Sequence, residues 1–311
     1  MEITQSLVDL AYAIRGAVLP HLGLLSSRQT LGKACSGDES FAIDEVAERA
    51  IVEFIEKRRL DVAYYSEDRG LVEFGAPEHV LIVDPIDGTR PAMAGFEQCV
   101  VSIALAPYDR DARLSDVSFG CILEIKTDRL YTATKDSVSI REDGRELPIT
   151  LSPNTNPDKM AWSLEIAGRP AETVIGSVAH LIDKSSIRGG FFIYNSTAYS
   201  LTRLVTGQLN AVVDVGNRIL RERPDARPRF MEAGNGAVMG LFPYDIAAAV
   251  LIAKSAGCTV TDAFGNDIGT TRLLDTSEAN IQSIVAASNP ALHEILVAEI
   301  NAEVGSVECG V

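Results

Sequence analysis

The chain has 311 residues, of which 46% are hydrophobic and 23% charged, so it can bury a sizeable core in one large domain or two ordinary ones. Its formal net charge of −15 argues against general binding to nucleic acid or to anionic membranes, because both repel an acidic protein. An acidic enzyme can still bind phosphate compounds where bound cations or local arginine and lysine residues invert the charge.

The first half of the chain predicts helices followed by strands. Apolar residues at helical spacing predict amphipathic helices at 4–18 and 45–58. The runs 80–84 and 99–108 predict buried strands. Three alternating segments predict an antiparallel meander, and they cover 119–125, 129–134 and 137–143. This half is therefore expected to be of the α+β type.

The polar, proline-bearing stretch 152–157 is the predicted domain boundary, and it divides the chain into 1–152 and 153–311. Beyond it, strands and helices alternate. The predicted strands cover 160–166, 191–195, 211–216, 258–265 and 283–288, and the predicted helices cover 171–183, 196–208, 244–257 and 290–300. Such alternation is typical of an α/β half.

The cysteines predict neither a disulfide framework nor a zinc site. Their number is odd and none form a C-x-x-C pair; they are Cys35, Cys99, Cys121, Cys258 and Cys309. The first residues do not resemble a signal peptide, and the longest aliphatic run, 247–253, is too short to span a bilayer. We therefore expect a protein of the reducing cytoplasm.

The most informative segment is Asp84-Pro-Ile-Asp87-Gly-Thr89, which follows a predicted buried strand. Pro85 cannot continue a central ladder and Gly88 permits a tight turn, so the chain is expected to turn here. Two carboxylates that leave one strand through such a turn can converge on a hard cation, and Mg²⁺ prefers oxygen ligands. The alternative is an ordinary turn in which the aspartates accept hydrogen bonds from backbone N–H groups.

Further acidic residues stand at the ends of predicted elements. The aromatic strand 64–66 ends in Glu67 and Asp68, Asp44 precedes the second helix, and Asp245 begins a helix of small residues. Each alone could be a capping residue. Taken together, they suit a polynuclear Mg²⁺ site, for which Asp245 would supply the remote acid from a second domain.

Five motifs in order resemble the inositol monophosphatase-like family of Mg²⁺-dependent, lithium-sensitive phosphatases. They are Asp44-Glu-Val-Ala-Glu48, Ser66-Glu-Asp68, Asp84-Pro-Ile-Asp-Gly-Thr89, Asn195-Ser-Thr-Ala198 and Tyr244-Asp-Ile-Ala-Ala248, which has tyrosine where the family has tryptophan. The resemblance implies a layered αβαβα sandwich of the inositol monophosphatase and fructose-1,6-bisphosphatase type. It also implies an active site between the two halves, and a homodimer.

The same resemblance implies a metal-binding role for the matched acids. Glu67, Asp84 and the carbonyl oxygen of Ile86 would hold a first Mg²⁺, and Asp84, Asp87 and Asp245 a second. A third, weaker ion can share Glu67. Such ions neutralise the phosphate, lower the pKa of a bound water and stabilise the leaving oxygen.

Catalytic and substrate-binding roles follow from the resemblance as well. Asp44 and Thr89 would orient the attacking water, with Glu67 beside them, and the N–H groups of Gly88 and Thr89 would bind the phosphate. Asp68 would either touch metal through water or support the ligands. The expected substrate contacts are completed by Asn195, Ser196, Thr197 and Asp245.

Two other functions are less well supported by these residues. A haloacid-dehalogenase-type phosphatase would need D-x-D-G-T near the chain start, whereas here two residues separate Asp84 from Asp87. A noncatalytic phosphate or metal sensor on the same fold would be expected to lack one of the acids, and all are retained.

The substrate is left open at this stage. Relatives act on inositol phosphates, fructose bisphosphate, histidinol phosphate or 3′-phosphoadenosine nucleotides, but Arg90-Pro91 stands where many inositol phosphatases have Asn-Phe. An arginine-rich segment before Asp245 is either a surface or subunit-contacting loop, or an anion clamp near the mouth of the site that would suit a bisphosphate. Its arginines are Arg218, Arg221, Arg223, Arg227 and Arg229.

Overall fold

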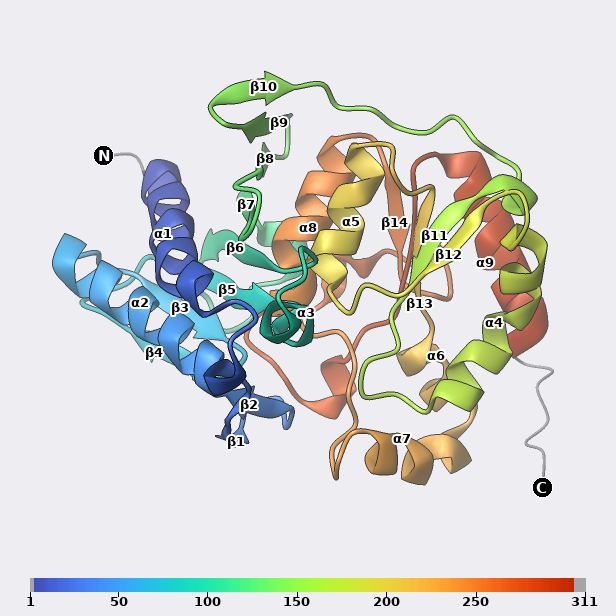
Figure 1. Ribbon diagram of the computed structural model, residues 1–311, viewed down its shortest axis with the longest axis horizontal. Helices are drawn as coiled ribbons and strands as arrows, with labels where there is room; N and C mark the ends of the chain where they lie inside the picture. The colour runs from blue at the N-terminus through green and yellow to red at the C-terminus, as the bar shows by residue number, and fades with distance from the viewer. Residues whose placement is uncertain (1–2, 305–311) are drawn as a thin grey trace.

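Two β-sheets alternate with three layers of helices in the computed structural model, which describes residues 3–304 (Figure 1). Helices α1 (Ile3–Val18) and α2 (Ala42–Arg58) cover the outer face of the first sheet. Helices α5 (Thr197–Val205) and α8 (Pro243–Ser255) lie between the sheets, and α4 (Ala171–Ser185) and α9 (Pro290–Val304) cover the far side of the second. The predicted αβαβα sandwich is confirmed, whereas Cys309 lies outside the described residues.

The first sheet has eight strands in the order β10-β9-β8-β7-β6-β5-β3-β4. Strand β3 runs parallel to β5, and the other neighbours are antiparallel, so the predicted meander is confirmed. The central strands are buried on both faces, which explains their continuous apolar sequences. The strands are β3 (Ala63–Ser66), β4 (Gly70–Glu73), β5 (His79–Asp87), β6 (Val100–Pro107), β7 (Phe119–Glu124), β8 (Leu130–Thr134), β9 (Ser137–Glu142) and β10 (Arg145–Leu147).

The second sheet has five strands in the order β12-β11-β13-β15-β14. Strands β11, β12 and β13 are parallel and are joined by α4 and α5, and β15 runs antiparallel to both of its neighbours. The carboxyl ends of the three parallel strands therefore lie at one edge of the sheet. The strands are β11 (Ala161–Leu164), β12 (Gly190–Phe192), β13 (Ala211–Asp214), β14 (Thr259–Thr261) and β15 (Ile284–Ala287).

Helix α8 is apolar on nearly all sides because it is sandwiched between the two sheets. Small side chains let it approach β7 closely: a Cβ atom added at Gly120 would lie 3.1 Å from the carbonyl oxygen of Ala248. This packing holds the first turn of α8, which carries Asp245, against the end of β5.

Several short elements are absent from the sequence prediction. A hairpin of β1 (Thr30–Lys33) and β2 (Glu39–Phe41) precedes α2, and the short helix α3 (Thr89–Ala94) follows β5. Neither has the long hydrophobic period on which the prediction depends. The arginine-rich segment, treated as a loop, is mostly helical, with α6 (Gly216–Glu222) and α7 (Arg227–Ala233).

The predicted helix at 45–58 begins three residues earlier, at Ala42, so Asp44 lies inside its first turn. The Asp44 carboxylate accepts a hydrogen bond from the backbone N–H of Phe41 at 2.9 Å and caps the helix. Across the described residues, no helix combines the length and the apolar character needed to cross a membrane.

Candidate metal centre and active site

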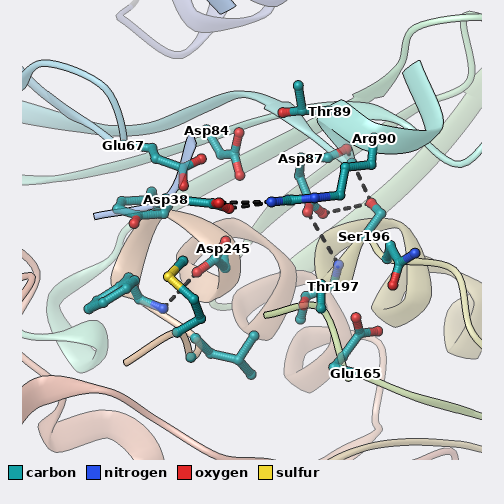
Figure 2. Close-up of a pocket in the computed structure, with 18 of the residues that line it drawn as sticks. Asp38, Glu67, Asp84, Asp87, Thr89, Arg90, Glu165, Ser196, Thr197 and Asp245 are labelled. Atoms are coloured by element: carbon teal, nitrogen blue, oxygen red, sulfur yellow. Dashed lines mark hydrogen bonds and ion pairs between the residues drawn. The ribbon is translucent and has the colours of Figure 1, made fainter. Parts of the chain in front are cut away.

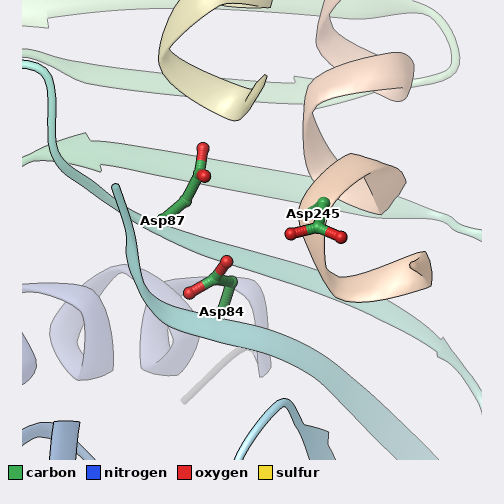
Figure 3. A group of neighbouring side chains, drawn as sticks. All are labelled: Asp84, Asp87 and Asp245. Atoms are coloured by element: carbon green, nitrogen blue, oxygen red, sulfur yellow. The ribbon is translucent and has the colours of Figure 1, made fainter. Parts of the chain in front are cut away.

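Three aspartates meet where β5 ends and α8 begins. Asp84 and Asp87 come from β5 and Asp245 from α8, and one carboxylate oxygen of each lies within 4.8 Å of the other two (Figure 3). The pairing of β5 with β6 shifts register between Asp84 and Asp87. A regular strand would place residues three apart on opposite faces, so this irregularity is what lets both side chains face the same pocket.

The turn after Asp87 depends on glycine. Gly88 has φ 92°, and a Cβ atom there would lie 2.3 Å from the carbonyl oxygen of Gln98. Any larger residue would therefore strain the backbone and clash. The turn carries the chain directly into α3, where Thr89 is the first residue.

Glu67 joins the three aspartates because β3 runs parallel to β5, which brings the carboxyl ends of the two strands together. The hydroxyl of Ser36, from the β1–β2 hairpin, donates to Glu67 Oε1 at 3.3 Å. Asp68 does not line this pocket, and its backbone carbonyl oxygen accepts a hydrogen bond from the thiol of Cys35.

Burial and mutual repulsion keep these carboxyl groups from ionising easily. The pKa values of Glu67, Asp84 and Asp245 are raised well above normal, first by burial and then by the neighbouring carboxylates. Burial raises the pKa of Asp87 to about 6. The carboxylates that face this space offer hard oxygen atoms as metal ligands, and among the residues that line it there is neither histidine nor cysteine. Such a set fits a hard divalent cation such as Mg²⁺.

Thr89 links the pocket to Asp44. Its hydroxyl oxygen lies 3.2 Å from Asp44 Oδ1 and 3.1 Å from the carbonyl oxygen of Ile86. Thr89 and Ile86 line the pocket, whereas Asp44 lies behind Thr89 and is almost completely buried. Burial raises the pKa of Asp44 to about 7.

The start of α5 forms the side of the pocket that faces Asp87 (Figure 2). Ser196 donates its hydroxyl to Asp87 Oδ2 at 2.8 Å, and the N–H groups of Thr197 and Ala198 donate to the same carboxylate at 3.3 and 2.5 Å. Asn195 lines the pocket with a left-handed φ of 53°. The helix amino terminus thus stabilises the charge of Asp87.

Four charged residues of the pocket were not among the sequence candidates. Arg90 forms a two-pronged ion pair with Asp38 at 2.8 and 3.1 Å. Glu165 and Arg169 follow β11, and Arg169 pairs with Asp214 in the interior. The available signal was their place at the carboxyl end of the predicted strand 160–166, because ligands bind beyond the carboxyl ends of such strands; Glu165 is near that end and Arg169 follows it.

The β1–β2 hairpin and the loop before α8 meet at the mouth of the pocket. Lys33 Nζ donates to the carbonyl oxygen of Asn235 at 2.7 Å, and the Asn235 amide donates to Glu39 Oε1 at 2.8 Å. Both segments also line the pocket, through Asp38 and through Met239. The complete lining is Asp38, Glu67, Asp84, Ile86, Asp87, Gly88, Thr89, Arg90, Glu165, Ala167, Arg169, Asn195, Ser196, Thr197, Met239, Gly240, Leu241, Phe242, Tyr244 and Asp245.

Of the two alternatives for the arginine-rich segment, the anion clamp is not supported, because none of its five arginines lines the pocket. Arg218 is buried and donates to the carbonyl oxygen of Ala263 and to Asn301. Arg227 and Arg229 form exposed ion pairs with Glu278 and Glu172. These contacts favour a structural and surface role, and the cations that border the pocket are Arg90 and Arg169 instead.

The sequence matches the model of the inositol monophosphatase family over residues 2–304. The chain belongs to this family. It is 28% identical over 294 residues to a fructose-1,6-bisphosphatase/inositol-1-monophosphatase of Methanothermobacter thermautotrophicus, with 92% of each chain covered. It is 29% identical over 235 residues to an inositol-1-monophosphatase of Mesorhizobium japonicum, with 74% of each covered.

The fold agrees with this assignment. The structure of the extragenic suppressor protein suhB from Bartonella henselae superposes with a TM-score of 0.72 at 19% identity, covering 96% of this chain and 98% of that one. That likeness concerns the fold alone. The family and its named relatives identify the chain as a phosphatase, a phosphoric monoester hydrolase.

Proposed function

We propose that this enzyme hydrolyses a small phosphate monoester in a Mg²⁺-dependent reaction, by direct attack of water. One observation carries the proposal: the carboxylates of Glu67, Asp84, Asp87 and Asp245 are gathered at one pocket. Among the described residues, none of the four forms an ion pair with lysine or arginine. A cluster of this kind is stable as carboxylates only when cations from solution neutralise it.

The residues divide into two ligand sets. Glu67, Asp84 and the carbonyl oxygen of Ile86 would hold one Mg²⁺, Asp84, Asp87 and Asp245 a second, and a third can share Glu67. When bound, these ions would neutralise the phosphate, lower the pKa of water and stabilise the leaving oxygen.

The chain itself would position the water and the phosphate. Thr89 would accept a hydrogen bond from the attacking water while donating its own proton to Asp44, which holds the hydroxyl in one orientation. Because burial raises the pKa of Asp44 to about 7, this carboxyl group can take up a proton near neutral pH. The N–H groups of Gly88 and Thr89 would contact the phosphate oxygens. Ser196 and Thr197, which donate hydrogen bonds to Asp87, would lie beside the bound substrate.

The substrate we favour is a sugar or polyol phosphate, because the relatives named above are inositol-1-monophosphatases and fructose-1,6-bisphosphatases. A bisphosphate is the second candidate, and the presence of Arg90 and Arg169 in the pocket favours it. We also propose that the enzyme is a homodimer of the cytoplasm. Retention of all the acids speaks against a noncatalytic sensor.

A phosphate-release screen tests the proposal. The purified protein is assayed with inositol phosphate, fructose bisphosphate, histidinol phosphate and adenosine bisphosphates, in Mg²⁺ and in EDTA. Release that requires Mg²⁺ supports the proposal. Absence of Mg²⁺-dependent release from every ester, by a protein that is folded and binds Mg²⁺, would favour the noncatalytic sensor.

Lithium provides a narrower test of the second ligand set. We expect Li⁺ to inhibit turnover by competing at the position formed by Asp84, Asp87 and Asp245. The measurement is the initial rate against Li⁺ concentration at several Mg²⁺ concentrations, with Na⁺ and K⁺ as matched controls. Activity that responds equally to all three ions would count against such a site, while leaving the fold and the first ligand set unaffected.

A further inference from the structure

Glu165 is a buried carboxylate that the proposed reaction does not use. It immediately follows β11, at the edge of the second sheet where the parallel strands end, and only 3% of its surface is exposed. It nevertheless lines the pocket, on the side away from Glu67 and Asp84 (Figure 2). The crevice beyond the carboxyl ends of parallel strands is where α/β sheets bind their ligands.

The two oxygens of Glu165 are in different situations. Oε1 accepts a hydrogen bond from the hydroxyl of Ser200, on α5, at 2.9 Å. For Oε2 there is no hydrogen bond or ion pair within the part of the chain that the structure describes, and this oxygen is not sealed from solvent. Glu165 therefore presents one held oxygen and one open oxygen to the pocket.

The neighbouring carboxylate on β13 shows the contrast. Asp214 ends that strand, pairs with Arg169 and accepts a hydrogen bond from the N–H of Gly216 at 2.7 Å. It is completely buried and does not line the pocket. Of these two acids at the sheet edge, Glu165 is the one with an acceptor left for a ligand.

The surroundings restrict what that ligand group can be. The carboxylate of Glu165 would repel a phosphate or carboxylate placed against it. Arg169 lines the same wall, so an ammonium group placed there would face a guanidinium group as well as the carboxylate. A neutral hydrogen-bond donor is repelled by neither charge and can donate to the carboxylate. In the leaving group of a phosphate ester, that donor is a hydroxyl.

We propose that Glu165 is a specificity-determining residue whose open oxygen accepts a hydrogen bond from a hydroxyl group of the leaving alcohol. The preferred substrates are then phosphate esters of polyhydroxy alcohols that carry a free hydroxyl besides the esterified one. This inference rests on the proposed function of the same pocket. A site built to bind a hydroxyl discriminates strongly against analogues that lack it, because the buried acceptor is left without a partner.

The test compares Glu165→Gln with wild type on two esters, at saturating Mg²⁺. One is a polyol phosphate found in the screen, and the other is p-nitrophenyl phosphate, whose leaving group has no further hydroxyl. With Ser200 still donating to the amide oxygen, the NH₂ group would face the pocket and could no longer accept. We expect kcat/KM for the polyol phosphate to fall about tenfold or more relative to that for p-nitrophenyl phosphate.

Two variants complete the design. Glu172→Gln makes the same chemical change on the exposed surface of α4 and should leave both esters unaffected. Ser200→Ala removes the donor that holds Oε1 and should lower the discrimination between the esters in the same direction, but less. If Glu165→Gln does not fold, the ratio of kcat/KM between the two esters in Ser200→Ala tests the proposal instead.

The outcomes separate this inference from the proposed function. If wild type releases phosphate from neither ester, the proposed function fails first. If wild type is active and Glu165→Gln lowers kcat/KM for both esters by the same factor, Glu165 does not recognise the hydroxyl. Wild type that prefers an amino alcohol phosphate to the matched polyol phosphate would also overturn the inference.

Discussion

The two walls of the pocket both bury carboxylates, but they stabilise them differently. On the wall formed by the end of β5 and the start of α8, Asp84, Asp87 and Asp245 face one another without a cation from the described chain. Behind the opposite wall, Asp214 is buried outside the pocket and is paired with Arg169, which lines that wall; their side chains are 0% and 4% exposed.

This difference separates a binding function from a structural one. A carboxylate that pairs with its own arginine is already neutralised, so breaking the pair mainly costs stability. A cluster without such a partner is strained until a cation binds, so changing it mainly alters metal binding and catalysis. Substitutions in the cluster should therefore change activity most, and substitutions in the pair should change stability most.

The largest effect is expected for Asp84→Asn. The amide keeps the size of the side chain but is a poor ligand for a hard cation, so turnover should fall about a thousandfold, equivalent to several kcal/mol of transition-state stabilisation. Metal-free Asp84→Asn should unfold at a higher temperature than metal-free wild type, because one repelling charge is gone. Near-normal activity at limiting Mg²⁺ would show that Asp84 is not a ligand.

Asp214→Asn should act mainly on stability. It leaves Arg169 as an unpaired buried charge, which typically costs about 3–5 kcal/mol of unfolding free energy. Denaturant unfolding measures the loss, with Asp225→Asn as the matched control, since the side chain of Asp225 is 69% exposed. Equal stability of the two variants would contradict the contrast between the walls.

The pH dependence of stability should reverse on adding Mg²⁺. Burial raises the folded-state pKa of Asp44 and Glu165 to about 7 and that of Asp87 to about 6, from ordinary values of 3.8, 4.5 and 3.8. The folded metal-free protein therefore binds more protons than the unfolded chain between about pH 4 and 7. Stability from these groups is present below that range and is lost as the pH rises through it.

Mg²⁺ competes with protons at its proposed ligands, among them Asp87, so it should stabilise the protein more at about pH 8 than at about pH 5. Thermal unfolding across this range, with and without Mg²⁺, measures both trends, and Ca²⁺ and Na⁺ show whether the ion is selected. A Mg²⁺ effect that does not change with pH would mean that the ion binds away from the buried carboxylates.

The smallest effect is expected for the double variant Arg227→Ala and Arg229→Ala. Both arginines form exposed ion pairs outside the pocket, and such pairs contribute little. We expect kcat/KM for a monophosphate and for a bisphosphate to stay at the wild-type values, and the unfolding temperature to change little. A loss of kcat/KM for the bisphosphate alone would support the anion clamp and contradict the surface role that the structure favours.

Local sequence determined much of this protein. The apolar run of β5 and the turn chemistry of Asp84-Pro-Ile-Asp87-Gly-Thr89 are adjacent in the chain, so both the strand end and the carboxylate pair could be predicted. The meander and the alternating second half followed from hydrophobic period in the same way. The domain division at residue 152 stays a prediction, since α8 comes from the later part of the chain but packs on the first sheet.

Tertiary structure decided which charges meet. Asp245 could have been an ordinary helix cap, and only the packing of α8 between the sheets brings it to Asp84. The same sequence could not show that Arg169 neutralises Asp214 while Glu165 keeps an open oxygen, or that the arginine-rich segment lies outside the pocket. Periodicity and turn chemistry act between neighbours in the chain, whereas the partner of a buried charge is set by elements far apart in sequence that fold against each other.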